Sequence, residues 1–458
     1  MIKSIFSISI FFSAAILSAA PTTSPDLGTT FPLRLSDLSN TVALAQNRAT
    51  AAQNLRDLVN ESFKDAQPDI TSETVRGKLK GGMWACGLLE IPMESAHNAL
   101  QSLLTRYELL DEDLGKKTLE LTFGLFAFDF KEEVTSIALT TKYPKHFASA
   151  VLYLRRLDKT EQETWERFRP EMEKRWPEWQ EQPILKALSL ICDQREPIQP
   201  PPLRTILGQQ FMPGKPVIYS FQRNNRDFEG LVVIRRADGR FARNAEGNIW
   251  SVPQLTRSNS ALPGFISNGS TPQGIHTIMG VGQETNPYIG RTPYIETALP
   301  IEKTPAEFFH EPKYENTSWT MTLYTDMLPT EWQNYWPTQL AWYAGKAGRC
   351  YMYSHGTTID PDYYLGMPWY PNTPSLGCLT CKEIWNPATG KAFQSDQLAL
   401  YNAWISACHN LNPHQVWTLK TPPNEKLTGY CAVIELDNAQ RPVALAEVLN
   451  EIMLADKR

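Results

Sequence analysis

One cysteine and one histidine late in the chain have the residue types and neighbours of a nucleophile and its base. Cys378 follows Gly377, and His355, 23 residues earlier, precedes Gly356. Cysteine is a strong nucleophile for acyl transfer only as the thiolate, and histidine is the usual acceptor of its proton. A glycine beside each lets backbone and substrate approach closely, so we predict that the Gly377 and Cys378 amides face the oxyanion of an intermediate.

Three short motifs in chain order extend this pattern. They are Thr271-Pro272-Gln273-Gly274, His355-Gly356-Thr357 and Ser375-Leu376-Gly377-Cys378. Together they resemble the catalytic domain of the L,D-transpeptidase (YkuD-like) family, over roughly residues 214–436. The resemblance implies a β-sandwich-like catalytic domain that needs no metal or organic cofactor. It also implies a substrate, the peptidoglycan stem peptide, which Cys378 attacks at the bond after the third residue.

By this resemblance Cys378 is the nucleophile and His355 the general base, while Gly356 and Gly377 complete the catalytic segments. Four further positions match as substrate-binding residues: Thr271, Gly274, Thr357 and Ser375. The terminal D-amino acid would leave as a thioester forms on Cys378, and a second stem amine or water would then resolve the thioester. The implied products are a 3→3 cross-link or a shortened stem peptide.

Two positions depart from the family pattern and leave other interpretations open. Leu376 stands where the family most often has a second histidine, and Thr380 stands where arginine or asparagine is common. A wall-binding module of the same fold without catalysis is one alternative. Another is a thiol–disulfide oxidoreductase that uses the C-x-x-C of Cys378 and Cys381. Cys381 also fits as a packed core residue, and no second cysteine pair suggests a zinc site.

The bulk composition restricts the classes of protein that fit. The 458-residue chain has a net charge of −5 and a pI near 5.9, which argues against nucleic-acid binding. Lys3, an apolar run from Ile5 to Leu17 and small residues before Pro21 predict a signal peptide over residues 1–20. The mature protein is then exported to the periplasm or cell wall, with no stable membrane span. Seven cysteines, an odd number, predict at least one thiol that is free or paired outside the chain.

The spacing of apolar residues divides the chain into two parts. Helical spacing runs through residues 35–195, which predicts an all-α domain, possibly a solenoid of paired helices, whose partner the sequence does not identify. Proline-rich residues 196–203 predict a stiff linker. Residues 204–458 predict a mainly β, L,D-transpeptidase-like sandwich domain with a few helices, so the fold class is multidomain α and β.

Local signals predict individual elements and one insertion. Strands are expected at residues 215–222, 228–241, 247–255, 414–420 and 429–436, with helices at 395–409 and 441–454. A charged helix within 163–182 is expected to break at Pro170 and Pro177. The long gap between the first two motifs is rich in tryptophan and tyrosine, and we interpret it as an inserted segment whose aromatic residues pack as a core in preference to forming a lid.

Overall fold

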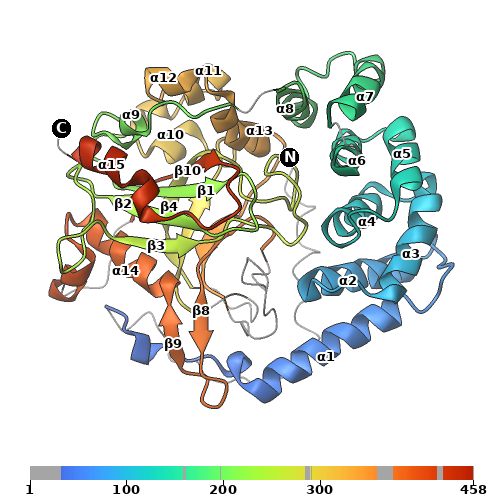
Figure 1. The fold of residues 1–458 in the computed structure, drawn as a ribbon, viewed down its shortest axis with the longest axis horizontal. Helices are drawn as coiled ribbons and strands as arrows, with labels where there is room; N and C mark the ends of the chain where they lie inside the picture. The colour runs from blue at the N-terminus through green and yellow to red at the C-terminus, as the bar shows by residue number, and fades with distance from the viewer. Residues whose placement is uncertain are drawn as a thin grey trace.

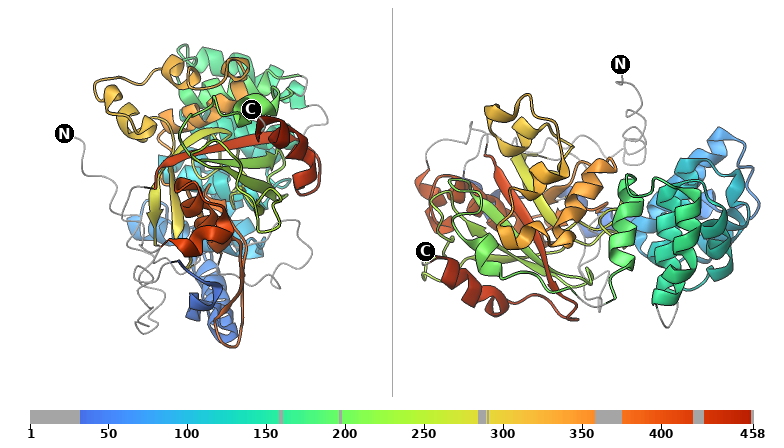
Figure 2. Two further views of the ribbon diagram at one scale, coloured as in Figure 1. Left: turned by 90° about the vertical axis from the view of Figure 1, so that its left-hand side faces the viewer. Right: turned by 90° about the horizontal axis from the view of Figure 1, so that it is seen from above.

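The computed structural model describes residues 32–157, 161–195, 198–283, 289, 291–357, 375–419 and 427–456. The predicted signal peptide lies outside the described residues. Within the described ranges, no helix combines the length and the apolar character that crossing a bilayer requires. The chain has an N-terminal helical region and a C-terminal region built on a mixed sheet, which lie side by side (Figures 1 and 2).

The helical region is a stack of helix pairs. Its helices are α1 (Ala45–Ser62), α2 (Glu73–Leu89), α3 (Glu94–Thr105), α4 (Glu112–Leu125), α5 (Lys131–Thr140), α6 (Pro144–Leu157), α7 (Glu161–Arg175) and α8 (Pro183–Cys192). The even-numbered helices contact one another in succession and form one row, while the odd-numbered helices form a second row behind it. Figure 1 shows the stack as an arc beside the sheet. Successive helices therefore alternate between two layers.

One helix prediction in this region is wrong. Helix α7 continues through Pro170 and ends at Arg175, two residues before Pro177. Trp165, Phe168 and Met172 on α7 are buried in the helical core. Burial of three large side chains outweighs the backbone hydrogen bond that an internal proline removes.

The sheet of the C-terminal region has eight strands. They are β1 (Val217–Arg223), β2 (Gly230–Arg235), β3 (Ser251–Gln254), β4 (Gly274–Gly282), β5 (Tyr294–Ala298), β6 (Tyr353–His355), β7 (Leu379–Thr380) and β10 (Gly429–Asp437). Their order is β3-β2-β1-β10-β4-β5-β6-β7, with parallel pairing at β1–β10 and β6–β7 and antiparallel pairing elsewhere. β8 (Glu383–Trp385) and β9 (Ala392–Ser395) form a separate hairpin.

The predicted sandwich of two facing sheets is not what the described strands form. They make one sheet that curls until its edges meet, because Leu255, directly after β3, exchanges two backbone hydrogen bonds with Thr380 of β7 at 2.7 and 2.8 Å. Residues along β10 alternate between two cores: Tyr430 and Ala432 lie in one, and Cys431 lies in the other. Alternation with a period of two places these side chains on opposite faces of the strand.

Helices cover both faces of this sheet. α14 (Asp396–Cys408), capped by the Ser395 hydroxyl, contacts β2, β3 and β5 on one face. The opposite face is covered by α9 (Leu203–Leu207), α10 (Pro305–Phe309), α13 (Leu340–Lys346) and α15 (Leu445–Asp456), with α11 (Met321–Thr325) and α12 (Thr330–Gln333) outside them. The strand predicted at residues 414–420 is wrong: a 3-10 helix, Pro413–Thr418, occupies this segment because Asn412 and Gln415 form a capping box ahead of the turn.

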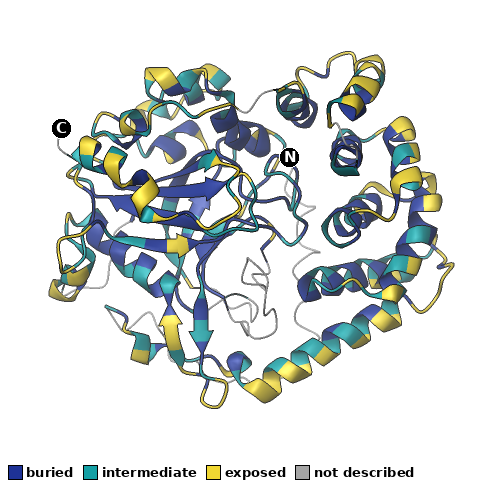
Figure 3. Cartoon of the chain, viewed as in Figure 1, coloured by how far each residue is buried: buried dark blue, intermediate teal, exposed yellow. Residues whose placement is uncertain are grey.

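The inserted aromatic segment packs as a core, as the sequence analysis favoured. Tyr324 and Trp332 are 0% exposed, and Trp342 is 5% exposed. They belong to one apolar cluster that continues into the helical region, where α8 packs against α13. Figure 3 shows buried residues along α8 and α13 and exposed residues on the outer sides of the helices.

The first described residues belong to the sheet region and not to the helical stack. Leu33 and Leu38 are buried in the same core as α14, and the Asn40 amide donates to the Gly390 carbonyl at 2.8 Å. The Leu33 carbonyl also accepts from the Asn402 side chain of α14 at 3.1 Å. The helical stack therefore begins at α1, later than the predicted boundary at residue 35.

Candidate active site

Strands β6 and β7 bring the predicted nucleophile and base to one face of the sheet. Their parallel register pairs Ser354 with Leu379 and His355 with Thr380, so Tyr353 lies opposite Cys378 one step earlier. Aligned residues of neighbouring strands point to the same face, and residues two apart on a strand share a face. The side chains of Cys378 and His355 therefore lie on the same face of the sheet, diagonally across the strand pair.

The backbone beside His355 fixes the orientation of its imidazole. Nδ1 lies 2.7 Å from the carbonyl oxygen of Gly356. A carbonyl oxygen only accepts hydrogen bonds, so Nδ1 carries the proton of the neutral ring and Nε2 carries the lone pair. The ring is 1% exposed. This is the tautomer that a base acting through Nε2 needs, with a backbone carbonyl in the orienting position that a carboxylate occupies in other triads.

Cys378 differs from the other cysteines in its surroundings. Its sulfur accepts the backbone N–H of Tyr353 at 3.4 Å, and its thiol points toward the Tyr351 carbonyl at 3.8 Å. The side chain is partly exposed. Burial raises the pKa of each of the other six thiols, which are Cys86, Cys192, Cys350, Cys381, Cys408 and Cys431. The environment thus favours Cys378 as the reactive thiol of the chain.

Two hydroxyls hold the turn that carries the cysteine. The Ser375 hydroxyl accepts the Gly377 N–H and donates to the Cys378 carbonyl, both at 3.0 Å. The Thr271 hydroxyl donates to the Gly377 carbonyl at 2.8 Å. Both side chains are at most 1% exposed. Because Ser375 takes the Gly377 N–H, the predicted role of that amide as an oxyanion donor is not met in this structure.

A buried arginine, which the sequence analysis did not single out, lies under the same turn. Arg349 is 5% exposed, and its guanidinium donates to the carbonyls of Gly269 at 2.7 Å, Ser270 at 2.9 Å and Leu376 at 3.4 Å. Burial lowers the pKa of Arg349 to about 10, and attraction to an ionised Cys378 partly opposes this change. The guanidinium therefore places a positive charge beside the nucleophile turn.

Each of the two motif glycines makes room for a buried charged side chain. A Cβ atom on Gly377 would lie 2.0 Å from Nη2 of Arg349, and Gly377 also has a φ of +120°, which other residues avoid. A Cβ atom on Gly356 would lie 2.2 Å from the carboxyl carbon of Glu383. The glycines beside the nucleophile and the base are thus required by packing as well as by any substrate.

Glu383 is a buried carboxyl group next to the histidine motif. Its Oε1 accepts from the hydroxyl of Ser395 at 2.6 Å and from that of Thr292, and burial raises its pKa to about 7. Its Oε2 has no hydrogen-bond partner among the residues that the structure describes. Neither Arg349 nor Glu383 belongs to a motif, and only their positions in the fold bring them to the site.

The remaining predicted site residues hold the fold around the pair. The Thr357 hydroxyl accepts the Glu383 N–H at 3.0 Å, and the Thr357 carbonyl accepts from the Trp385 indole at 2.8 Å. Gly274 begins β4, where a Cβ atom would lie 2.3 Å from the Thr338 carbonyl. The structure brings Thr271 and Ser375 to the nucleophile turn and Thr357 to the histidine, while Gly274 lets the inserted segment approach the sheet.

Cys381 lies on the other face of the sheet from Cys378. It is 0% exposed, packs in the core around α14, and accepts from the Gln254 side chain at 3.7 Å. Both cysteines are free thiols. Opposite orientation and complete burial do not favour a redox pair and agree with the interpretation of Cys381 as a packed residue.

Two large exposed side chains lie in the chain segments that contain or contact Cys378. Leu376, in the place of the family's second histidine, is 49% exposed, and Tyr351 is 68% exposed with a φ of +60°. Tyr353 stacks on Tyr294 with ring centroids 4.6 Å apart. Leu376 lines a hollow against α2 and α4, with Trp84 and Leu121, whereas Tyr351 and Tyr353 contact the sulfur of Cys378 through their backbone.

Comparison of the chain with known protein families, with curated proteins and with solved structures gives no match. Within the described ranges, no three His, Cys, Asp or Glu side chains gather in a way that could hold a metal ion. The chemistry of the site is therefore argued from its residues and their geometry.

Proposed function

We propose that this chain is an exported cysteine acyltransferase that acts on peptidoglycan stem peptides, as an L,D-transpeptidase or L,D-carboxypeptidase in the periplasm or cell wall. The observation that carries the proposal is the pairing of β6 with β7, which puts a partly exposed Cys378 on the same face of the sheet as a His355 held by the Gly356 carbonyl. The order of the three sequence motifs supports the choice of an L,D-transpeptidase-like catalytic domain over other cysteine acyltransferases.

The proposed reaction has two steps. His355 Nε2 takes the thiol proton, and the Cys378 thiolate attacks the carbonyl carbon of the third stem residue. The C–N bond breaks, the terminal D-amino acid leaves with the proton from the imidazolium, and a thioester remains. A stem amine or water then attacks the thioester, His355 accepts its proton, and the thiolate is released. The N–H of Tyr353 and the Arg349 cation both stabilise the sulfur as an anion.

Mass spectrometry of the mature protein with tetrapeptide muropeptides tests this function. We expect a covalent adduct that has lost the terminal D-amino acid, together with new dimers or tripeptides. Cys378→Ala should abolish all three products, and Cys381→Ala is the matched control because its thiol is buried on the other face. Binding without any product would contradict the enzyme and favour a wall-binding module.

A further inference from the structure

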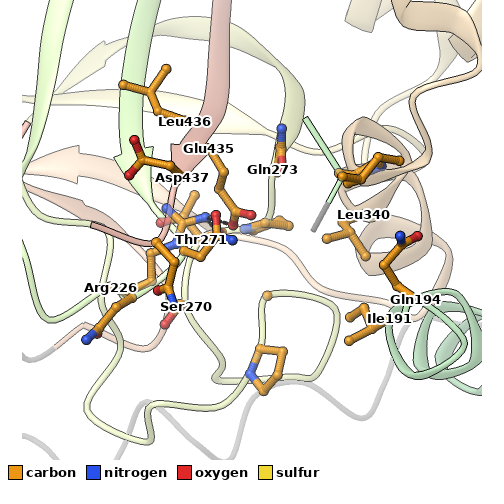
Figure 4. Close-up of a pocket in the computed structure, with 18 of the residues that line it drawn as sticks. Ile191, Gln194, Arg226, Ser270, Thr271, Gln273, Leu340, Glu435, Leu436 and Asp437 are labelled. Carbon is orange, nitrogen blue, oxygen red and sulfur yellow. Dashed lines mark hydrogen bonds and ion pairs between the residues drawn. The ribbon is translucent and has the colours of Figure 1, made fainter. Parts of the chain in front are cut away.

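A cavity of about 790 Å³ lies between the helical region and the sheet region, apart from the thiol. Arg226, Thr271 and Glu435 line it from the sheet side, Ile191 lines it from α8, and Gln194 lines it from just after that helix (Figure 4). Ligand cavities of this size hold molecules as large as an oligosaccharide unit, and they occur preferentially between domains. Nothing in the proposed reaction uses this space.

The charges around the cavity cancel. Its lining includes four arginines and four carboxylates, and these groups are engaged in ion pairs. Arg226 bonds to Glu435 at 2.6 Å, and Arg257 bonds to Asp227 at 2.7 Å. A site for a phosphate or carboxylate ligand would leave a positive charge for the ligand, so this balance favours an uncharged ligand.

The polar groups that remain are mainly carboxamides. They are Gln194, Gln199, Asn224, Asn225, Gln273 and Asn438. A carboxamide both donates and accepts, which matches hydroxyl and acetamido groups. Tyr335 and Trp336 add aromatic surface on which a sugar ring can pack.

Gln273, the variable residue of the first motif, gives the second observation that points to a ligand. It is 0% exposed and lines the cavity. Neither atom of its amide makes a well-formed hydrogen bond to another described residue, although the Tyr335 hydroxyl lies near it. A buried amide without such bonds costs free energy, and a turn of this side chain toward the cavity would let a ligand with hydroxyl or acetamido groups supply them.

We propose that this cavity binds the uncharged, N-acetylated glycan to which the stem peptides are attached. The choice of glycan rests on the proposed function, while the sugar-binding chemistry rests on the lining alone. The cavity also touches the nucleophile turn, because Thr271 lines it and donates to the Gly377 carbonyl at 2.8 Å. The Thr271 carbonyl accepts from the Arg226 guanidinium at 3.3 Å.

Titration of the Cys378→Ala full-length mature protein with chitotetraose, a tetramer of N-acetylglucosamine, tests the proposal by calorimetry. We expect saturable binding, weakened about tenfold or more by Gln273→Leu and by Trp336→Ala, which corresponds to the loss of one or two good contacts. Gln394→Leu is the matched control, since Gln394 is exposed on β9. Cellotetraose, which lacks the acetamido groups, should bind more weakly.

The outcomes separate this inference from the proposed function. Saturable chitotetraose binding without acylation by muropeptides would leave the glycan site standing and remove the transpeptidase. Acylation of muropeptides with no saturable sugar binding, or with binding that Gln273→Leu does not change, would overturn the glycan site alone. Equal affinity for cellotetraose would overturn the recognition of acetamido groups.

Discussion

Replacement of Arg349 by methionine tests whether a buried cation activates the thiol. Nη2 of Arg349 lies 2.0 Å from the position that a Cβ atom on Gly377 would take. A Cα–Cβ bond, one Cα–Cα step of about 3.8 Å and the cysteine side chain separate this position from the sulfur, so the charge lies within roughly 10 Å of the Cys378 sulfur. At an effective dielectric constant of about 20, a separation of about 10 Å is worth about 1.7 kcal/mol of attraction to a thiolate.

The assay is the rate of Cys378 alkylation by iodoacetamide as a function of pH. An attraction of about 1.7 kcal/mol corresponds to a midpoint that moves up by about 1.2 pH units when the cation is removed. Arg349→Lys keeps the charge and loses the planar fork, so its midpoint should move less. The other six thiols are expected to react slowly because burial raises their pKa.

Arg235 provides a matched control for lost stability. It is 1% exposed, and its guanidinium donates to backbone carbonyls, including that of Met212 at 3.3 Å, well away from Cys378 in the fold. Arg235→Met should lower the melting temperature as Arg349→Met does and leave the alkylation midpoint unchanged. A midpoint that stays within about 0.3 pH units of the wild type in Arg349→Met would refute the electrostatic role.

Three further predictions concern the residues around the pair. Glu383→Gln should change how the free energy of unfolding depends on pH. Only the unfolded carboxyl ionises between its ordinary pKa of 4.5 and the folded value of about 7, so the wild type should lose about 3 kcal/mol of stability relative to the variant as the pH rises through this range. Melting temperatures of the two proteins that change with pH in parallel would contradict this prediction. Gly356→Ala should cost about 1–3 kcal/mol in urea unfolding because its Cβ would meet Glu383, whereas Gly81→Ala, with open space around it on α2, should be neutral or stabilising. Ser375→Ala should slow the acylation of Cys378 by muropeptides while the fold persists, because the nucleophile turn loses two hydrogen bonds. An unchanged acylation rate would show that the hydroxyl is dispensable.

Local sequence signals predicted the elements of this chain better than its layers. The strand at 429–436 and the helix capped by Ser395 are present because alternation and capping are properties of short segments. The strand prediction for residues 414–420 was wrong because an apolar run of this length fits a strand or a turn of helix equally well. The curled sheet depends on the Leu255–Thr380 bridge between residues 125 positions apart, and no local pattern encodes such a contact.

The candidate site shows the same division between local and distant information. Cys378 and His355 were found because each has glycine as a neighbour, and the structure gives that neighbour a second reason in the packing of Arg349 and Glu383. Those two charged residues could not be found from spacing, since an arginine and a glutamate are ordinarily surface residues. Only their burial, together with the space that each glycine leaves, distinguishes them.

The helical region is connected to the nucleophile through one loop of the sheet region. Glu120 of α4 accepts from the Asn268 side chain at 3.0 Å, and Lys145 of α6 donates to the Ser267 hydroxyl at 2.9 Å. Arg349 donates to the next two carbonyls of this loop, those of Gly269 and Ser270, and also to that of Leu376 beside the cysteine. A displacement of the helical stack would therefore move the loop, the guanidinium and the turn together. The stack belongs to the machinery that positions the thiol, and its removal should impair the reaction even with every residue of the sheet region intact.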